Sequence, residues 1–560
     1  MATLQFKGKS AVWNHHLSVP YHTLEKDAKK SLKGTDAEEN LIIEGDNLLA
    51  LKSLLPKYQG RIKCIYIDPP YNTGNEGWAY NDNVNSPMIR EWIGKEVGLD
   101  DLTRHDKWLA MMTPRVKILD ELLTDDGLIF ISIDENELYN LKNLLDEIFV
   151  ENNFIANITV QVNKGGRDYL PIAITHEYLL CYSKSELSII NELEDETNSL
   201  PLTDQNGGYE LRELRNRNPR FNRGNRPNLY YPIYINPASA NENGECLVKL
   251  EKTKDFSIEV YPLNSRGDDS CWRWGKQKVL SNIASSVEVS NVVGKQRRDG
   301  GWNIYEKSRR TAHKAKSIWD ESEVRTEQGT IDLRELGLGG VFDHPKPVYL
   351  IKKILRLATD KDSIILDSFA GSGTTAQAVL DFNAEDGSNR KFILVQLPEE
   401  VKKGTPAYKM GFRQVHEITR ERVKRVIAKN KYKTGFTYYT LGSSIDAESI
   451  LTGKLPTYKE FAKYVYYLAT GKNHPDEKKI KEDDSFVGKT DHQSVYLIYE
   501  KNVDALKKLA ITLDWAQKMH KKDSNKKIVY APACYLDDEA LEQFNIKFVS
   551  IPYNLFERVT

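Results

Sequence analysis

Short apolar runs alternate with polar turns and amphipathic stretches near the start of the chain. Residues 62–67, IKCIYI, form an apolar, β-branched run of the kind that becomes a buried parallel strand. The apolar run at 40–43 predicts another strand. A turn at Gly45, Asp46 and Asn47 ends that strand, and a leucine-rich amphipathic helix follows with Asp46 or Asn47 as its cap. This order of strand, turn and helix indicates an α/β fold.

The same rhythm continues after residue 100, fades between about 185 and 330, and then returns. The predicted elements are a helix over 108–123, a strand over 128–133, a strand within 172–184, a strand ending at Asp367, a helix from Thr374, a strand over 391–396 and a basic helix over 413–429. Beyond about residue 430, a tyrosine-rich helical stretch and three short apolar strands predict a small separate α/β unit. No catalytic residue is recognisable in it, and we expect a role in assembly.

The strand at 62–67 is followed directly by Asp68, Pro69, Pro70 and Tyr71. Two consecutive prolines cannot continue a central strand, so the chain must leave the sheet at its carboxyl edge, where open α/β sheets bind ligands. A bare Asp-Pro pair is more often an ordinary turn. These four residues directly after such a strand instead suit the methylation of an exocyclic amine.

An aromatic amino nitrogen is a poor nucleophile because its lone pair is delocalised into the ring. The Asp68 carboxylate and the main-chain carbonyl of Pro69 can each accept one of its N–H bonds, which localises the lone pair for in-line attack. Neither proline has an N–H that would compete beside these acceptors, and Tyr71 offers a flat face for a base swung out of its duplex. His176, beside Glu177, suggests a general base. Amine methylation does not need one, and we expect a structural or base-packing role for His176.

A second loop follows the predicted strand that ends at Asp367. Residues 369–373, FAGSG, turn the chain tightly before the helix at Thr374, and glycines let a backbone approach a ligand closely because they have no Cβ. By itself the loop also fits a dinucleotide fingerprint, with Ala376 as its third small residue. A phosphate-binding Walker loop is excluded, because the lysine that should precede its Ser or Thr is absent.

Together these stretches resemble the amino-group DNA methyltransferases. DPPYNTG, from Asp68 to Gly74, is similar to the catalytic motif of the modification subunit of type III restriction–modification systems. The loop at 369–373 is similar to the FxGxG loop that holds S-adenosylmethionine, and the motif order resembles the β class. The resemblance implies a Rossmann-like S-adenosylmethionine-dependent methyltransferase sheet with circularly permuted motif order, an inserted target-recognition domain and a small C-terminal α/β domain. Asp rather than Ser before Pro-Pro-Tyr favours adenine N6 over cytosine N4.

The resemblance also implies roles for single residues. The implied catalytic residues are Asp68, Pro69, Pro70 and Tyr71. Segment 342–347 resembles the family's PKP segment, which packs over the methionine end of the cofactor. The implied cofactor residues are Asp46, His344, Pro345, Lys346, Pro347, Asp367, Phe369, Ala370, Gly371, Ser372, Gly373 and Thr374. Many methyltransferases place an acid after the next strand to hold the cofactor ribose, but this chain has Gln396 there, with Glu399 and Glu400 beyond, so the ribose ligand stays open.

Two basic segments lie where the βα rhythm fades. The first crowds arginines before the aromatic LYYPIY, and the second, GKQRRDGGWNIYEKSRRTAHKAK, is opposed only by Asp299 and Glu306. A charge run is usually a solvated face, but arginines interleaved with aromatics, asparagines and glycines favour nucleic acid. The predicted DNA-binding residues are Arg212, Arg215, Arg217, Arg220, Arg223, Arg226, Arg297, Arg298, Arg309 and Arg310. The pattern does not separate contacts to bases from contacts to phosphates.

These features predict five parts. They are an N-terminal arm (1–40), the catalytic half of the methyltransferase domain (41–185), the target-recognition domain (186–330), the cofactor-binding half (331–430) and a C-terminal α/β assembly domain (431–560). A Rossmann-like sheet can be entered at either half, so both ligand loops can still meet at its carboxyl edge.

Composition narrows the setting. The formal net charge of the 560 residues is −1, so a nucleic-acid enzyme of this kind must concentrate its positive charge locally. The five cysteines lack paired spacing, which argues against disulfides or a zinc site and fits a reducing cytosol, and we predict no metal. No apolar run approaches the roughly 20 residues of a membrane span. We expect a bacterial cytoplasmic protein that acts on double-stranded DNA, with a second copy of the chain or a restriction (helicase–nuclease) subunit as further candidate partners.

Three other functions fit parts of the sequence. Cytosine-C5 methylation needs a nucleophilic cysteine, in that family within a Pro-Cys pair, and no cysteine here follows a proline. A glutamine methyltransferase acting on proteins usually has Asn at the position of Asp68 and has no use for an arginine-rich insertion. A non-enzymatic nucleic-acid-binding protein would keep the basic segments but not both ligand loops, and it should not crosslink to labelled S-adenosylmethionine.

Overall fold

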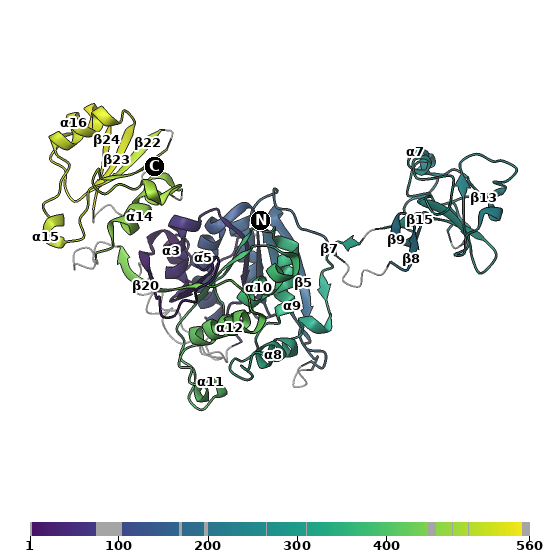
Figure 1. The fold of residues 1–560 in the computed structure, drawn as a ribbon, viewed down its shortest axis with the longest axis horizontal. Helices are drawn as coiled ribbons and strands as arrows, with labels where there is room; N and C mark the ends of the chain where they lie inside the picture. Colours follow the sequence, from purple (N-terminus) through teal and green to yellow (C-terminus); the bar gives the residue numbers. More distant parts are fainter. Residues whose placement is uncertain are drawn as a thin grey trace. The chain divides into compact units, whose positions relative to one another are not determined.

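The structure is a computed structural model that describes residues 3–73, 103–166, 171–194, 200–264, 266–309, 311–445, 455–472, 474–490 and 492–551. The chain divides into two compact units (Figure 1). Met1–Asn191 and Lys316–Thr560 form the first, and Glu192–Ala315 form the second. The second unit falls within the range 186–330 that the sequence proposes as an insertion, and its role in recognition stays a prediction.

The first unit is built around a ten-stranded mixed sheet. In sheet order its strands are β1 (Tyr21–Lys26), β20 (Thr437–Ile445), β2 (Leu41–Glu44), β19 (Lys391–Gln396), β18 (Ile364–Asp367), β3 (Ile62–Ile67), β4 (Leu123–Ile133), β6 (His176–Ser183), β5 (Phe154–Gln161) and β17 (Ile318–Trp319). The six strands from β20 to β4 run parallel to their neighbours. Their carboxyl ends therefore share one edge of the sheet, where open α/β sheets bind ligands.

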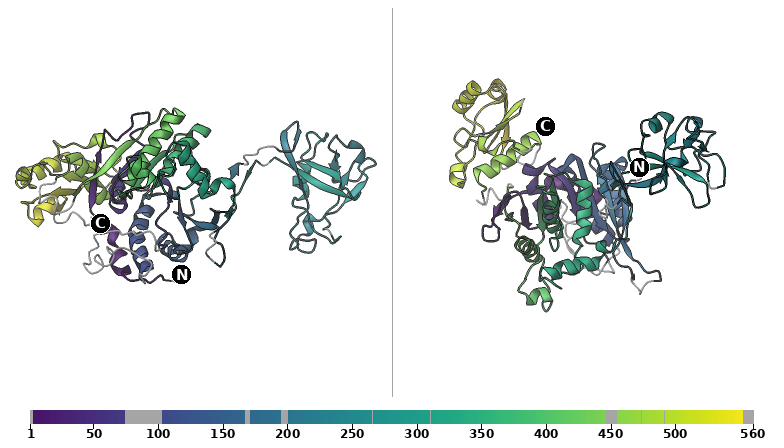
Figure 2. Two further views of the ribbon diagram at one scale, coloured as in Figure 1. Left: turned by 90° about the horizontal axis from the view of Figure 1, so that it is seen from below. Right: turned by 45° about the vertical axis from the view of Figure 1, so that its right-hand side comes forward.

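Helices cover both faces of this sheet. On one side α3 (Asn47–Tyr58), α5 (Arg104–Leu122) and α6 (Leu138–Phe149) pack against one another, and on the other α9 (Val348–Ala358), α10 (Thr374–Asp386) and α12 (Val415–Asn430) do so. In the left-hand view of Figure 2 the purple and blue helices lie below the sheet and the green ones above it. Because β3, β18 and β19 are covered on both faces, Ile65, Leu366 and Ile393 are fully buried. This burial explains why these strands read as continuous apolar runs.

The structure confirms the helices and strands predicted around the two ligand loops. It also adds four strands of the large sheet that the sequence did not predict, namely β1, β20, β5 and β17. β1 lies in the proposed N-terminal arm and β20 at the start of the proposed C-terminal part, and they pair with each other antiparallel. β20 continues the sheet next to β2. Most side chains of β20 are partly exposed and the last two of β1 are exposed, so these strands lack the apolar run of an interior strand.

The end of the chain forms a smaller α/β layer within the first unit. Its sheet has the order β21 (Phe486–Lys489), β22 (Gln493–Leu497), β23 (Lys526–Ala531) and β24 (Ile546–Ser550), with the last three strands parallel. The tyrosine-rich helix α14 (Tyr458–Thr470) packs against α3, and Tyr464 stacks on Tyr21 with ring centroids 4.6 Å apart. An α/β layer is therefore present at the end of the chain, but it belongs to the first unit and contacts the N-terminal part of the chain through α14, whereas the sequence predicted a separate unit.

The second unit is mainly β. Its three-stranded sheet has the order β12 (Val248–Lys249), β10 (Ile233–Ile235), β13 (Ile258–Val260). Its five-stranded sheet has the order β11 (Glu245–Cys246), β14 (Val292–Gln296), β15 (Trp302–Ser308), β9 (Gly207–Glu213), β8 (Leu202–Asp204). Trp272, Tyr231 and Ile235 belong to their shared core. A ladder of β7 (Leu193–Glu194) with β16 (Ala312–His313) brings the two ends of the unit together.

The structure also shows the state of the cysteines and whether the described residues include a membrane-spanning helix or a metal site. All five cysteines are free, and four of them are buried. In the ranges that the structure describes, no helix is long and apolar enough to cross a bilayer. The same ranges contain no group of three or more His, Cys, Asp or Glu side chains arranged to hold a metal ion.

Candidate active site

The turn from Asp68 to Tyr71 leaves the sheet at the carboxyl end of β3, as predicted. The indole nitrogen of Trp108 on α5 donates to the main-chain carbonyl of Pro70 at 2.7 Å, and Trp108 is fully buried. This hydrogen bond holds Pro70 in place against α5. Among the described residues no donor bonds to the carbonyl oxygen of Pro69, the acceptor that the sequence assigns to the substrate amine.

The next residue is also held from behind. Asn72 is buried with a positive φ of 61°, and its amide donates to Glu137 just before α6. The same carboxylate accepts from the Asn140 amide at 2.8 Å and contacts His105 Nδ1 at 2.6 Å. Burial raises the pKa of Glu137 above its ordinary value. These contacts anchor the end of the turn, and no local pattern could predict them because the partners lie 33 to 68 residues away from Asn72.

Four polar side chains converge on the turn. The Tyr71 hydroxyl lies 2.9 Å from Asp68 Oδ1 and 3.1 Å from Glu177 Oε2, and the Lys346 ammonium lies 2.6 Å from that hydroxyl. Lys346 Nζ is also 2.5 Å from Glu177 Oε1 and 3.4 Å from Asp68 Oδ1. A phenol has one proton, so Tyr71 donates to one carboxylate at a time while it accepts from the ammonium.

Burial and charge set the ionisation of this group. Burial raises the pKa of Asp68 above its ordinary value, Lys346 opposes that rise, and Glu177 adds to it. Burial lowers the pKa of Lys346, but the charges of Asp68 and Glu177 outweigh it, so the net shift is upward. Burial and the same two carboxylates raise the pKa of Tyr71 well above 10. The ammonium therefore compensates two carboxylates while the tyrosine stays neutral.

The glycine loop follows β18, which is the neighbour of β3 in the sheet. Gly371 and Gly373 have positive φ values of 51° and 84°. The main-chain N–H of Gly371 donates to Gln396 Oε1 at 2.7 Å, and its carbonyl accepts from the Thr419 hydroxyl at 2.6 Å. Gln396, at the position where an acid was expected for the ribose, is thus a support for the loop. A Cβ at Gly373 would lie 3.1 Å from the Thr419 carbonyl oxygen, so the loop fits closely against α12.

Arg422 of α12 holds the other side of the loop. Its Nη1 donates to the hydroxyls of Ser372 and Thr374, both at 2.7 Å, and its Nε donates to Gln377 at 2.9 Å. The side chain is fully buried, and burial lowers the pKa of its guanidinium to about 10. The sequence identified only a basic helix here, and nothing in that pattern singles out Arg422.

Two carboxylates stand beside the glycine loop. Asp367 accepts from the Thr375 hydroxyl at 2.5 Å and from the Phe369 N–H at 3.0 Å, and burial raises its pKa to about 7, with the Asp68 charge adding to the rise. Asp46 caps α3 by accepting from the N–H groups of Leu48 and Leu49 at 2.8 and 3.2 Å. Asp46 follows the end of β2 at the same sheet edge, and the predicted cap is confirmed.

The segment from His344 to Pro347 leads into α9. His344 is exposed with a positive φ of 52°, whereas Pro345 and Pro347 are buried. The segment packs tightly against α8 (Thr326–Glu335), because a Cβ at Gly329 would lie 2.0 Å from the Pro345 carbonyl oxygen. The Lys346 carbonyl accepts from the Thr374 hydroxyl at 3.1 Å. Lys346 therefore touches the glycine loop through its main chain and the Asp68 turn through its side chain.

The structure places most of the predicted DNA-binding arginines in ion pairs within the second unit. The pairs are Arg212 with Glu306, Arg215 and Arg217 with Glu213, Arg223 with Asp269, Arg297 with Asp299 and Arg309 with Asp204. Arg226 lies over the Phe221 ring, and Arg220 and Arg298 are exposed. Arg310, like Gly74 of the catalytic motif, lies outside the described residues. Arg217 remains 79% exposed despite its pair, whereas Arg215 is 18% exposed, so the two differ in their access to a ligand.

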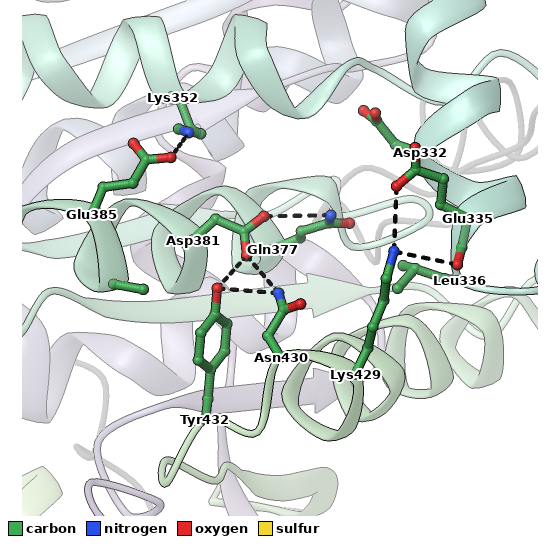
Figure 3. Close-up of a pocket in the computed structure, with 11 residues that line it drawn as sticks. Asp332, Glu335, Leu336, Lys352, Gln377, Asp381, Glu385, Lys429, Asn430 and Tyr432 are labelled. Carbon is green, nitrogen blue, oxygen red and sulfur yellow. Dashed lines mark hydrogen bonds and ion pairs between the residues drawn. The ribbon is translucent and has the colours of Figure 1, made fainter.

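A separate pocket of about 400 Å³ opens beside α8, α9, α10 and the end of α12 (Figure 3). Its lining is largely charged, with Lys352 paired to Glu385 and Lys429 to Glu335. Asp381 accepts from Gln377, Asn430 and Tyr432 across it. None of the residues that the sequence assigns to base or cofactor lines this pocket.

Residues 62–406 match the DNA methylase family, a range that spans both ligand loops. The EcoPI Mod subunit of a type III restriction-modification enzyme, from Escherichia phage P1, is 35% identical to this chain over 449 residues, which cover 74% of this chain and 68% of that protein. The type II methyltransferase M.KpnI from Klebsiella pneumoniae is 35% identical over 408 residues, covering 71% of this chain and 90% of that protein. Among solved structures, the PvuII cytosine-N4-specific DNA methyltransferase is similar at a TM-score of 0.32 and 12% identity, over 69% of this chain and 94% of that one.

Proposed function

This chain belongs to the DNA methylase family, and we propose that it transfers a methyl group from S-adenosylmethionine to the N6 amino group of adenine in double-stranded DNA. The observation that carries the proposal is the placement of two loops on neighbouring parallel strands. Asp68 follows β3, the glycine loop follows β18, and the two strands pair directly. A methyl acceptor at Asp68 and a methyl donor at the glycine loop would then meet at the carboxyl edge of the sheet.

The residues of the glycine loop fit this cofactor. Gly371 and Gly373 keep the backbone open, since side chains there would contact Phe342 and Thr419. The residues that would hold S-adenosylmethionine are Asp46, His344, Pro345, Lys346, Pro347, Asp367, Phe369, Ala370, Gly371, Ser372, Gly373 and Thr374. When bound, it supplies an electrophilic methyl group.

The chain's own part in the reaction is to hold the amine. The carboxylate of Asp68 and the carbonyl of Pro69 would accept its two N–H bonds, while Trp108 occupies the next carbonyl and keeps the turn in place. In the structure Asp68 Oδ1 accepts from the Tyr71 hydroxyl, and Oδ2 has no hydrogen bond to any described residue. The nitrogen lone pair localised in this way would take up the methyl group that the bound cofactor supplies, and the Asp68 carboxylate, which holds one N–H of the amine, would accept the proton that is released.

The choice of adenine and the biological setting are part of the proposal. The family covers enzymes that act on adenine N6 and on cytosine N4. Asp at position 68 and the similarity to a type III Mod subunit favour adenine. That similarity also supports a role in restriction–modification in the bacterial cytoplasm, with a restriction subunit as partner and a second copy of the chain in the complex. The second unit would bind the DNA through its exposed arginines.

Asp68→Ala tests the proposal. We expect the variant to lose methyl transfer and to keep its affinity for S-adenosylmethionine, because Asp68 is assigned to the amine and not to the cofactor. Modified-base sequencing of DNA from hosts expressing either protein measures the first, and calorimetric titration measures the second. N6-methyladenine at one sequence in the parent, absent in the variant, is the expected result. N4-methylcytosine would overturn the choice of base, and loss of cofactor binding would overturn the assignment of Asp68.

A further inference from the structure

The ammonium of Lys346 lies where the target base has to bind. It is 3.4 Å from Asp68 Oδ1, the carboxylate assigned to the amine, and 2.6 Å from the Tyr71 hydroxyl. It is 5.1 Å from the centroid of the Tyr71 ring, so it lies at the hydroxyl edge of that ring. A base that donates to Asp68 therefore meets the ammonium at this carboxylate.

Glu177 offers the lysine another partner. Its Oε1 is 2.5 Å from Lys346 Nζ, nearly 1 Å closer than Asp68 Oδ1 is. Glu177 comes from β6, which pairs antiparallel with β4, so a rigid sheet strand sets its position. The carboxylate is nearly buried, and charge-assisted hydrogen bonds of this kind are among the stronger ones in proteins.

We propose that Lys346 occupies the base site of the resting enzyme, and that Glu177 is a positioning residue that retains the lysine when the target amine takes its place at Asp68. The inference rests on the proposed function. Without DNA, the ammonium compensates the charge of Asp68, whose side chain is 27% exposed. When the base enters, the lysine gives up Asp68 but keeps Glu177, and one N–H of the amine replaces it as the donor to Asp68 while the other donates to the Pro69 carbonyl. No covalent bond changes at Lys346 or Glu177.

In this arrangement Lys346 opposes binding of the base, and Glu177 reduces that opposition. With Glu177 removed, Lys346 has only Asp68 and Tyr71 left and competes more strongly with the base. With both removed, that competitor is gone. The backbone does not depend on the pair, because the Lys346 carbonyl accepts from Thr374 and the flanking prolines are buried. A merely structural ion pair predicts the opposite pattern, in which the second substitution adds to the damage of the first.

A double-mutant cycle distinguishes the proposed role of Glu177 from that of a merely structural ion pair. We expect Glu177→Gln to raise the KM for DNA at least tenfold while leaving the affinity for S-adenosylmethionine within twofold. Adding Lys346→Met should reverse most of that rise. Lys352→Met is the matched control, because Lys352 lies on the following helix α9 and pairs with Glu385 outside the site. If the double variant has a higher KM than Glu177→Gln alone, the proposal is wrong.

The pH dependence of kcat/KM gives a second readout. The charged and titratable groups that face Asp68 are Lys346, Glu177, Tyr71, Tyr66 and Asp367. Lys346→Met removes the ammonium that favours ionised Asp68, so the acid limb should move to higher pH. Glu177→Gln removes a neighbouring carboxylate, so the limb should move to lower pH. Shifts in the same direction would contradict the assigned roles. If the parent enzyme transfers no methyl group, the proposed function itself is wrong. If the parent is active but the losses from Glu177→Gln and Lys346→Met simply add, only this inference is wrong.

Discussion

The ring and the hydroxyl of Tyr71 have different surroundings, and we expect the removal of each to lower the activity by a different amount. From the sequence, the ring is a stacking face, so Tyr71→Ala should cost more than Tyr71→Phe. The structure adds contacts of the hydroxyl with Asp68, Glu177 and Lys346. Hydrogen bonds to charged groups contribute about 1.5–3 kcal/mol, so we expect Tyr71→Phe to lower kcat/KM roughly tenfold or more. Tyr71→Ala should lose about 1–3 kcal/mol further in base stacking.

Steady-state methylation of one DNA substrate by the two variants measures these losses, and their affinity for S-adenosylmethionine is the control. A Phe variant as active as the parent would show that the hydroxyl contacts are not used. Equal losses in both variants would instead remove the stacking role.

Asp367 should make the stability of the fold depend on pH. Burial raises its pKa from 3.8 to about 7. Because folding favours the protonated form, this contribution to stability is fully present below the unfolded pKa of 3.8 and is lost as the pH rises through about 7. Asp367→Asn should remove that part of the decline. Thermal unfolding across this range measures it, with Asp360→Asn as the control because Asp360 is 78% exposed. An unchanged pH slope in Asp367→Asn would contradict the prediction.

At this scale the sequence predicts what is local and misses what the fold assembles. Asp68 and Tyr71 are recognisable because the strand and the motif are contiguous. Lys346 and Glu177 are 169 residues apart, and only the folded chain brings the segment before α9 and strand β6 to one carboxylate. The arginines show the converse limit. Their clustering is visible in the sequence, but their pairing with Glu213, Asp269 and Asp204 is not.

The helix α10 provides a matched pair of glycines at the scale of an element. Gly373 caps its start and Gly387 its end, with positive φ values of 84° and 67°. A non-glycine residue in this region costs about 1–2 kcal/mol, so alanine at either end should lower the melting temperature. Gly373 also lies in the glycine loop, where a Cβ would contact Thr419 of α12, whereas nothing lies within 4 Å of a Cβ at Gly387. We expect Gly373→Ala, but not Gly387→Ala, to weaken S-adenosylmethionine binding at least tenfold.

Calorimetric titration and thermal unfolding of both alanine variants make the comparison. Equal cofactor affinity in the two would show that the loop around Gly373 is not the binding site. A loss of affinity in both would point to a general loss of folding instead.

Elements were predictable in proportion to their burial. β3, β18 and β19 are interior parallel strands, and their apolar runs predicted them closely. β1 and β20 pair antiparallel at the margin of the sheet and expose part of each strand, so period-two alternation is weak in them. Their partners are also more than 400 residues apart in the chain, a separation that no local pattern can bridge.

At the scale of the whole molecule, segments distant in the chain share one sheet. The catalytic turn comes from residues near 70 and the glycine loop from residues near 370, and β18 lies directly between β3 and β19. The segment between them can leave the sheet and return without disturbing either loop. The net charge of −1 also fits this division, because the basic residues expected to meet DNA are concentrated in the second unit.

The residues of the first unit that flank the second unit are held within the first unit, which defines where an exchange can be made. The main-chain N–H of Asn191 donates to Leu357 at the end of α9 at 2.9 Å, and β17 pairs with β5 immediately after the unit. Replacing residues 192–315 by the matching unit of a relative keeps both of these attachments.

We expect such a chimera to methylate a different sequence while still producing N6-methyladenine. The reason is that Asp68 and the glycine loop act on any adenine presented to them, whereas side chains of the exchanged unit decide which adenine arrives. Modified-base sequencing identifies the new site, and an unchanged affinity for S-adenosylmethionine shows that the first unit is intact. A chimera that folds, binds the cofactor and still methylates the original sequence would place specificity outside residues 192–315, with the C-terminal α/β layer as the next region to exchange.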